Sequence, residues 1–199
     1  MRHKVPHFRQ PNDYTCMAAC LKMMLDYREK AIPFDKIVTG IRTTKKHGAD
    51  LVRASLYLAK LGMGPTLFYF DPDKIPSWYQ GVSQTEWQKN LQRRTAQGWP
   101  WRQLSKLIAG GGIFYPQHLS MDGLRRILRR QPIIVLIESS YLDTQKGAPV
   151  KRMQHAILLV DQDRSGVHFL NPQAEEIQRI RWDIFEIAYF SCGGEALYF

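Results

Sequence analysis

The first third of the chain carries apolar residues at helical spacing. The residues that recur at intervals of three and four are Cys16, Ala19, Cys20, Met23 and Tyr27. They share one face and predict an amphipathic helix over residues 16–27. The preceding turn residues place a cap at Asp13 or Thr15. Cys16 is therefore expected in or next to the first turn of this helix.

Two more helices are predicted in the same part of the chain. An apolar stripe follows Gly48 and predicts a helix that Gly62 closes, and its members are Leu51, Ala54, Leu58 and Leu61. Residues 33–41 predict a short helix between the first helix and this one.

The last third of the chain predicts a sheet. A helix that begins at Ser120 leads into a β-branched run, which predicts a buried strand over residues 133–137. Further strands are predicted over 156–160, 167–170, 177–181 and 196–199, with a short helix, capped by Asp183, before the last. Because helices come first and the sheet second, we predict an α+β fold in which N-terminal helices pack on a C-terminal antiparallel sheet.

Residues 63–118 differ from both parts in composition. They contain prolines, the run Gly110 to Gly112, and four tryptophans, namely Trp78, Trp87, Trp99 and Trp101. Two helices are expected here, one opening at Thr85 and one over residues 101–108. We interpret the segment as an insertion in a single domain spanning residues 1–199. It either shapes a substrate cleft or simply packs in the core.

Composition narrows the classes of protein. With 199 residues and 44% hydrophobic content, the chain can bury a core without disulfides or metals. Its longest apolar runs, such as residues 133–137, are far shorter than the ~20 residues of a membrane helix. No apolar segment of the kind found in signal peptides follows the basic N-terminus, and the three cysteines are an odd number. We therefore expect no membrane association and a reducing, cytoplasmic compartment.

The net charge of +10 suggests a nucleic-acid partner, but its distribution does not. The positive charges occur as scattered pairs, such as Arg93-Arg94 and Lys151-Arg152, and no nucleic-acid-binding motif links them. We expect a solvated basic surface and no specific nucleic acid. An acidic substrate or partner is the alternative.

The candidate chemistry centres on a cysteine and a histidine. Cys16 is expected at a helix N-terminus. Unpaired backbone N–H groups and the helix dipole favour the thiolate form of a cysteine there. His155 begins an apolar strand and is the best-placed base. The alternative is a buried structural cysteine with an unrelated strand histidine.

Two amides complete the pattern. Gln10 lies six residues before Cys16, where its side chain could join the Cys16 N–H in stabilising an oxyanion. Asn171 follows the next strand, where it could accept a hydrogen bond from His155 and orient the ring. Taken singly, Gln10 is typical of a surface loop and Asn171-Pro172 of an ordinary turn.

These residues lie within segments that resemble a known family. The segments are residues 10–19, which read QPNDYTCMAA, residues 154–160, which read QHAILLV, and Asn171-Pro172. They resemble the papain-like cysteine peptidases related to the bacteriocin-leader-processing peptidases, the thirty-ninth peptidase family of the cysteine class, in stand-alone form. The similarity extends to residues 48–62, 124–137 and 193–197.

The resemblance implies a papain-like fold and hydrolysis of a peptide or protein substrate through an acyl-enzyme. It also implies that Cys16 is the nucleophile, His155 the base, Asn171 the orienting residue and Gln10 the oxyanion donor. Met17 replaces the small residue usual after the nucleophile. Gln154 stands where glycine often precedes the histidine, and both changes would narrow the cleft. The double-glycine cleavage site is not carried over, because no exporter segment accompanies the chain.

Three alternatives remain open at this stage. A transglutaminase-like acyltransferase or a glutamine deamidase would use the same residues. A non-catalytic peptide-binding module could share the fold. Cys16 and Cys20, one helical turn apart, could bind zinc with Cys192 or a histidine, although a second paired-ligand motif is lacking. The preferred hypothesis implies no cofactor.

Overall fold

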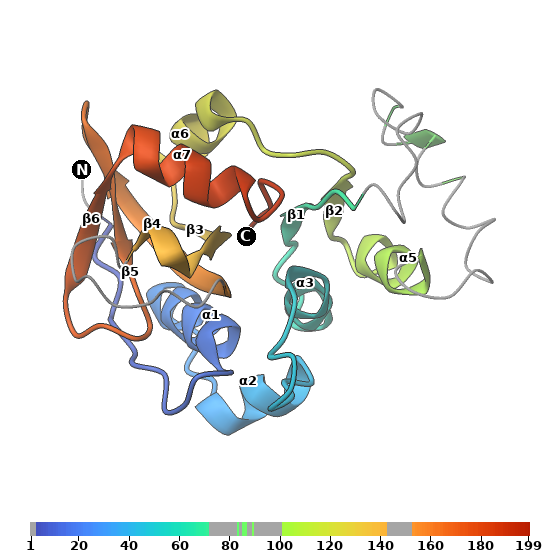
Figure 1. Ribbon diagram of the computed structural model, residues 1–199. Coiled ribbons are helices and arrows are strands. Elements are labelled where there is room, and N and C mark those ends of the chain that lie inside the picture. Colours follow the sequence, from blue (N-terminus) through green and yellow to red (C-terminus); the bar gives the residue numbers. More distant parts are fainter. Residues whose placement is uncertain (1–2, 72–82, 84, 87–88, 90–100, 143–152) are drawn as a thin grey trace.

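A mixed β-sheet organises the described part of the chain, which in this computed structural model comprises residues 3–71, 83, 85–86, 89, 101–142 and 153–199. The sheet has seven strands in the order β2-β1-β7-β3-β4-β5-β6 (Figure 1). In that order they are Ile113–Tyr115, Thr66–Phe68, Ala196–Tyr198, Ile133–Glu138, Gln154–Gln162, Gly166–Leu170 and Ile177–Arg181.

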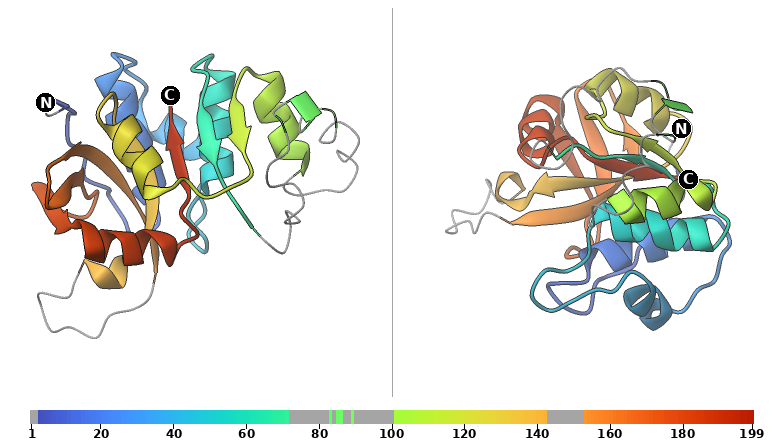
Figure 2. Two further views of the ribbon diagram at one scale, coloured as in Figure 1. Left: turned by 90° about the horizontal axis from the view of Figure 1, so that it is seen from above. Right: turned by 90° about the vertical axis from the view of Figure 1, so that its right-hand side faces the viewer.

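Helices cover both faces of this sheet (Figures 1 and 2). One face is covered by α1 (Cys16–Tyr27), α2 (Phe34–Gly40), α3 (Leu51–Lys60) and α5 (Trp101–Ala109). The other is covered by α6 (Met121–Leu128) and α7 (Trp182–Phe190), with the short 3-10 helix η3 (Ser139–Tyr141) against α7. These six α-helices and the sheet confirm the predicted α+β class.

The central strands are apolar on both sides because each of their faces meets a layer of helices. In β3, Ile134 and Leu136 pack toward α1, whereas Ile133, Val135 and Ile137 pack toward α6 and α7. Such two-sided burial explains the continuous apolar run that marked this strand in the sequence. The same alternation continues in β4, so both strands lie at the centre of the core.

The helix ends follow local side-chain chemistry. The Asp50 carboxylate accepts the Arg53 N–H at 2.8 Å and begins α3, and Gly62, at a φ of +71°, follows its end in the left-handed region. Thr15 is the N-cap residue of α1, but its hydroxyl donates to Asn12 O instead of capping the helix. Asp183, predicted to cap α7, lies in its first turn, and the N-cap residue is Arg181, which makes no side-chain cap hydrogen bond.

The sheet is larger than predicted, and it is not wholly antiparallel. Strands β1 and β2 pair parallel, and both come from the segment 63–118 that we interpreted as an insertion. Three-residue strands are too short to show an alternating pattern, which is why the sequence did not reveal them. Helix α5, from the same segment, packs against α3. Trp78, Trp87 and Trp99 lie outside the described residues, so their expected role is not tested.

No helix in the described ranges combines the length and apolar character needed to cross a membrane.

Candidate active site

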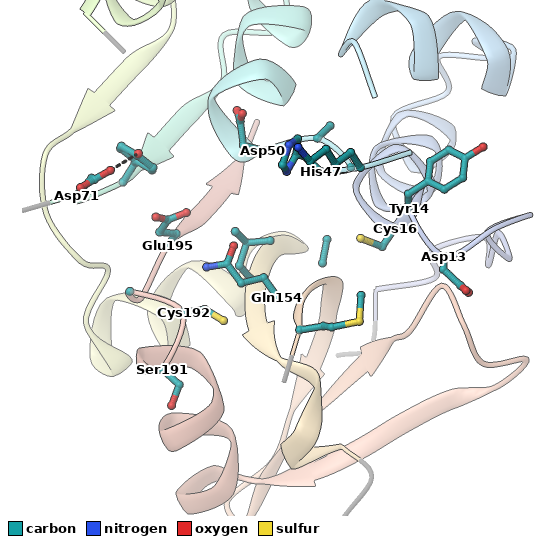
Figure 3. A pocket seen from close by; sticks show the side chains of 18 of the residues that line it. Asp13, Tyr14, Cys16, His47, Asp50, Asp71, Gln154, Ser191, Cys192 and Glu195 are labelled. Atoms are coloured by element: carbon teal, nitrogen blue, oxygen red, sulfur yellow. Dashed lines mark hydrogen bonds between the residues drawn. The ribbon is translucent and has the colours of Figure 1, made fainter. Parts of the chain in front are cut away.

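Cys16 is the first residue of α1 and lines a cleft of about 660 Å³. In Figure 3 its thiol projects from the start of α1, while Ser191, Cys192 and Glu195 come from the segment that follows α7. The first turn of a helix presents backbone N–H groups without helical partners. A nucleophile at this position is both accessible to a ligand in the cleft and close to donors that favour a negative charge.

The surroundings of Cys16 favour its thiolate. Burial by itself would raise the pKa of the Cys16 thiol. A hydrogen bond from His155 and the charge of its ring act in the opposite direction, together with the backbone N–H groups of Ala156 and Met17, and the net effect lowers the pKa. The histidine therefore contributes most to ionising the thiol.

His155 lies on β4, opposite Ile137 of β3, and only 4% of it is exposed. Its Nε2 is 2.9 Å from Oδ1 of Asn171, which follows β5, the neighbouring strand. The structure thus places the two side chains on adjacent strands, as expected from their positions in the sequence. With Nε2 engaged, Nδ1 is the ring nitrogen that faces the thiol.

The contacts of Asn171 determine the tautomer of His155. The backbone N–H of Gln173 donates to Asn171 Oδ1 at 3.0 Å, and Asn171 Nδ2 donates to Gln178 Oε1 at 3.0 Å. The NH2 group of an amide is a donor and cannot accept from the Gln173 N–H, so the Asn171 amide cannot be flipped. His155 Nε2 must therefore carry a proton, which leaves Nδ1 of the neutral ring as the acceptor for the Cys16 proton.

Gln10 is held beside this group by the N-terminal segment. Its backbone N–H donates to Pro172 O at 2.9 Å, next to Asn171. Its side-chain Nε2 donates to Asn12 O at 2.8 Å, and its buried Oε1 has no hydrogen-bond partner in the part of the chain that the structure describes. Because an amide nitrogen carries two hydrogens, one Nε2 donor remains for a ligand.

Cys16 is more exposed than the other three candidate residues. Gln10, His155 and Asn171 are each less than 9% exposed, and only Cys16 of the four lines the cleft. A ligand in the cleft therefore meets the thiol first. The polar groups that act on the thiol lie in the protein interior, where electrostatic interactions are strong.

The walls of the cleft carry charges of both signs. Lys45, Lys46 and His47 come from the α2–α3 loop, whereas the acidic wall residues are Asp13, Asp50, Asp71 and Glu195. Tyr69 donates to Asp71 Oδ2 at 3.3 Å, as drawn in Figure 3. Burial, followed by the charges of Asp71 and Glu195, raises the pKa of the Tyr69 hydroxyl.

Sequence reasoning missed these wall residues. Apart from Asp13, which precedes α1 and was considered only as its cap, they come from the loops after α2 and β1 and from the segment between α7 and β7, which are far apart in the chain. Residues 193–197 fall in the family resemblance, but nothing in the sequence indicates that Glu195 faces the same cavity as Cys16.

The other two cysteines differ from Cys16. Cys20 is fully buried, and burial, followed by the charge of Cys16, raises the pKa of its thiol. Burial, followed by Glu138 and Glu195, raises the pKa of Cys192 to about 12. The described residues contain no group of three or more His, Cys, Asp or Glu side chains arranged to hold a metal ion. The zinc alternative thus gains no support from the described geometry.

Comparison with known proteins identifies the fold. No protein-family model and no curated protein sequence matches the chain. Among solved structures, a candidate C39-like peptidase from Bacillus anthracis is 14% identical, with a TM-score of 0.52 over 98% of this chain and 94% of that chain. A double-glycine-motif protease from an AMS/PCAT transporter, solved with its leader peptide, is also 14% identical, with a TM-score of 0.52 over 98% of this chain and 91% of that chain. The protein therefore has the fold of the C39-like cysteine peptidases.

Proposed function

We propose that this protein is a cysteine peptidase or amide hydrolase that cleaves a peptide substrate through an acyl-enzyme. The observation that carries the proposal is the continuous arrangement of Cys16, His155 and Asn171. The thiol lies at a helix N-terminus with a lowered pKa, and the 2.9 Å contact between His155 and Asn171 sets the ring's tautomer. The C39-like fold and the leader peptide bound to one structural neighbour support a peptide as the substrate.

In the proposed mechanism, the Cys16 thiolate attacks the carbonyl carbon of an amide bound in the cleft. The oxyanion accepts hydrogen bonds from the remaining Gln10 Nε2 donor and from the Cys16 backbone N–H. Protonated His155 then gives its Nδ1 proton to the leaving amine, and the C–N bond breaks. Neutral His155 next takes a proton from water, which attacks the thioester, releases the acid and restores the ion pair.

Asn171 acts through His155 in this scheme. Its Oδ1 holds the Nε2–H, so Nδ1 faces the thiol throughout the cycle. As a neutral amide, Asn171 orients the ring without adding a negative charge beside it.

The three cysteines of the chain are free thiols, which fits the reducing cytoplasm proposed as its compartment. We further propose that residues 1–199 form one domain, because β1, β2 and α5 join the first and last thirds of the chain in one sheet and one helical layer.

A peptide-cleavage assay tests the proposal. A mixed peptide library is incubated with the parent protein and with Cys16→Ala, and the products are identified by mass spectrometry. We expect new termini with the parent only, and a covalent acyl adduct on Cys16 when the reaction is quenched early. His155→Ala is tested in the same assay. His168→Ala is its matched control, because His168 lies on β5 and pairs with Asp163 outside the cleft.

The products also separate the related reactions. Conversion of glutamine to glutamate without chain cleavage would indicate a deamidase, and transfer to an added amine in place of hydrolysis would indicate an acyltransferase. Intact peptides, no adduct and no difference between the parent and Cys16→Ala would refute catalysis and favour a binding module.

A further inference from the structure

A second hollow, of about 410 Å³, lies between α2, α3 and α5, and its lining is strongly cationic. Five of the residues that line it are basic, namely Arg42, Arg53, Lys60, Arg102 and Lys106. None of the described lining residues is acidic. We call this hollow, defined by these five side chains, the basic groove.

The charges of the basic groove are largely unneutralised. Arg53 is partly compensated, because its Nε is 3.4 Å from Asp50 Oδ2 and its Nη1 donates to Arg42 O. The side chains of Arg42, Lys60 and Arg102, like that of Lys106, form no ion pair with any carboxylate in the described ranges. Like charges gathered in one concave site repel one another and attract anions.

The rest of the lining suits a polypeptide better than a phosphate chain. Gln103 Oε1 is buried in the wall and has no hydrogen-bond partner among the described residues, so it can accept from a bound donor. A peptide N–H supplies one, whereas phosphate groups offer mainly acceptors. The side chains of Leu56 and Tyr57 add apolar surface, and the Tyr57 ring packs so closely on Gly40 that a Cβ there would lie 2.2 Å from Cε2.

The basic groove and the cleft that contains Cys16 are both lined by residues of the α2–α3 loop and of the start of α3. Lys45 and Lys46 line the cleft, while Arg42 and Arg53 line the groove on either side of the same α2–α3 loop. Helix α3 runs beside α5 (Figure 2). Its N-cap residue Asp50 lines the cleft, and its last residue Lys60 lines the groove. Its ten residues span about 15 Å, a distance that roughly five residues of extended peptide cover.

We infer that the basic groove is an exosite that binds an acidic segment of the peptide substrate, outside the residues that flank the bond that Cys16 attacks. Carboxylates of the segment pair with the Arg and Lys side chains, and a backbone N–H donates to Gln103. The inference rests on the proposed function, since it assigns the substrate's chemical class.

Binding is measured without turnover, on the full chain carrying Cys16→Ala. The probe is a fluorescently labelled peptide of alternating Glu and Gly, and its Kd is obtained by anisotropy at two salt concentrations. We expect Arg102→Glu with Lys106→Glu to weaken binding by about tenfold or more. The matched control is Arg126→Glu with Arg130→Glu, which makes the same charge change at exposed residues in and after α6, on the other face of the sheet. It should leave the Kd within about twofold.

A second double variant, Arg42→Gln with Lys60→Gln, removes two charges from the side of the groove formed by α2 and α3. With two independent groove variants, the test does not depend on the correct folding of either one. Equal weakening by the groove and control variants would overturn the exosite, because net charge alone would then explain binding. Tighter binding of a single-stranded oligonucleotide of equal charge, lost in the groove variants, would overturn the peptide assignment. Failure of the proposed function is visible separately, as a Cys16 that lacks enhanced reactivity in the parent protein.

Discussion

Replacing His155 with alanine tests the interaction on which the candidate site depends. The substitution removes the hydrogen bond and the positive charge that lower the pKa of Cys16, and it leaves the burial that raises it. The Cys16 pKa should therefore move above that of a free thiol. A thiol with a lowered pKa is ionised and reacts at lower pH, so the rise in its alkylation rate should shift to higher pH in His155→Ala.

The size of the effect follows from the thiolate population. A free thiol with a pKa of ~8.5 is about 1% ionised at pH 6.5, so the thiolate fraction at this pH can fall by up to about 100-fold. A more basic thiolate is a better nucleophile, with a Brønsted coefficient of about 0.4–0.5, which offsets roughly half of this loss on a logarithmic scale. We expect the alkylation rate at pH 6.5 to fall by up to about tenfold.

The assay follows iodoacetamide labelling of each cysteine by peptide mass spectrometry between about pH 5 and pH 9. Cys20 and Cys192 serve as internal references, because burial raises the pKa of both thiols. His168→Ala removes a histidine from β5 outside the cleft and should leave the Cys16 profile unchanged. Thermal unfolding of each variant confirms that the fold is retained.

Two results would refute the reasoning. If Cys16 of the parent titrates near a free thiol, the ion pair with His155 does not form. If the Cys16 profile is the same in the parent and in His155→Ala, the thiol is activated by the helix N-terminus alone. In either case the role given to His155 would have to be withdrawn.

Three further substitutions test other parts of the structure. Asn171→Ala releases His155 Nε2, and we expect kcat to fall roughly 10- to 100-fold with little change in KM, measured on the best peptide from the library. Gln10→Ala should lower kcat by about 10²–10³-fold yet leave iodoacetamide labelling of Cys16 nearly unchanged, because alkylation forms no oxyanion, and parallel losses in both assays would contradict this role. Leu158→Ala opens a cavity at a fully buried position of β4 and should lower the unfolding free energy by about 2–5 kcal/mol in urea titrations, whereas a loss below about 1 kcal/mol would contradict tight packing there.

The helices could be predicted because their signals are local. Ser120 accepts the Gly123 N–H and begins α6, as its position before an apolar stripe indicates. Gly62 follows the end of α3 as predicted, and the two-sided apolar run of β3 marked a buried strand. Each of these features depends on residues that are close together in the sequence, so a local pattern is enough to predict it.

The sheet edge and the cleft walls depend on distant residues and could not be predicted in this way. The pairing of Thr66 with Ile113 joins segments about fifty residues apart, and each strand is only three residues long. The acidic wall gathers Asp50, Asp71 and Glu195 from three loops. Their convergence results from the order of strands in the sheet, which periodicity does not encode.

The three cysteines together indicate what distinguishes a reactive thiol from a structural one in this fold. Burial is the largest influence on the pKa of all three, and it acts against ionisation in each case. Cys20 follows Cys16 by one helical turn on α1, yet it faces the core, where the charge of Cys16 raises its pKa further. Only Cys16 combines the first turn of the helix with a histidine from β4, and this combination outweighs the cost of burial. We therefore expect activation of the Cys16 thiol to depend on the packing of α1 against β4, and substitutions that shift this helix relative to the strand should reduce Cys16 reactivity without changing either side chain.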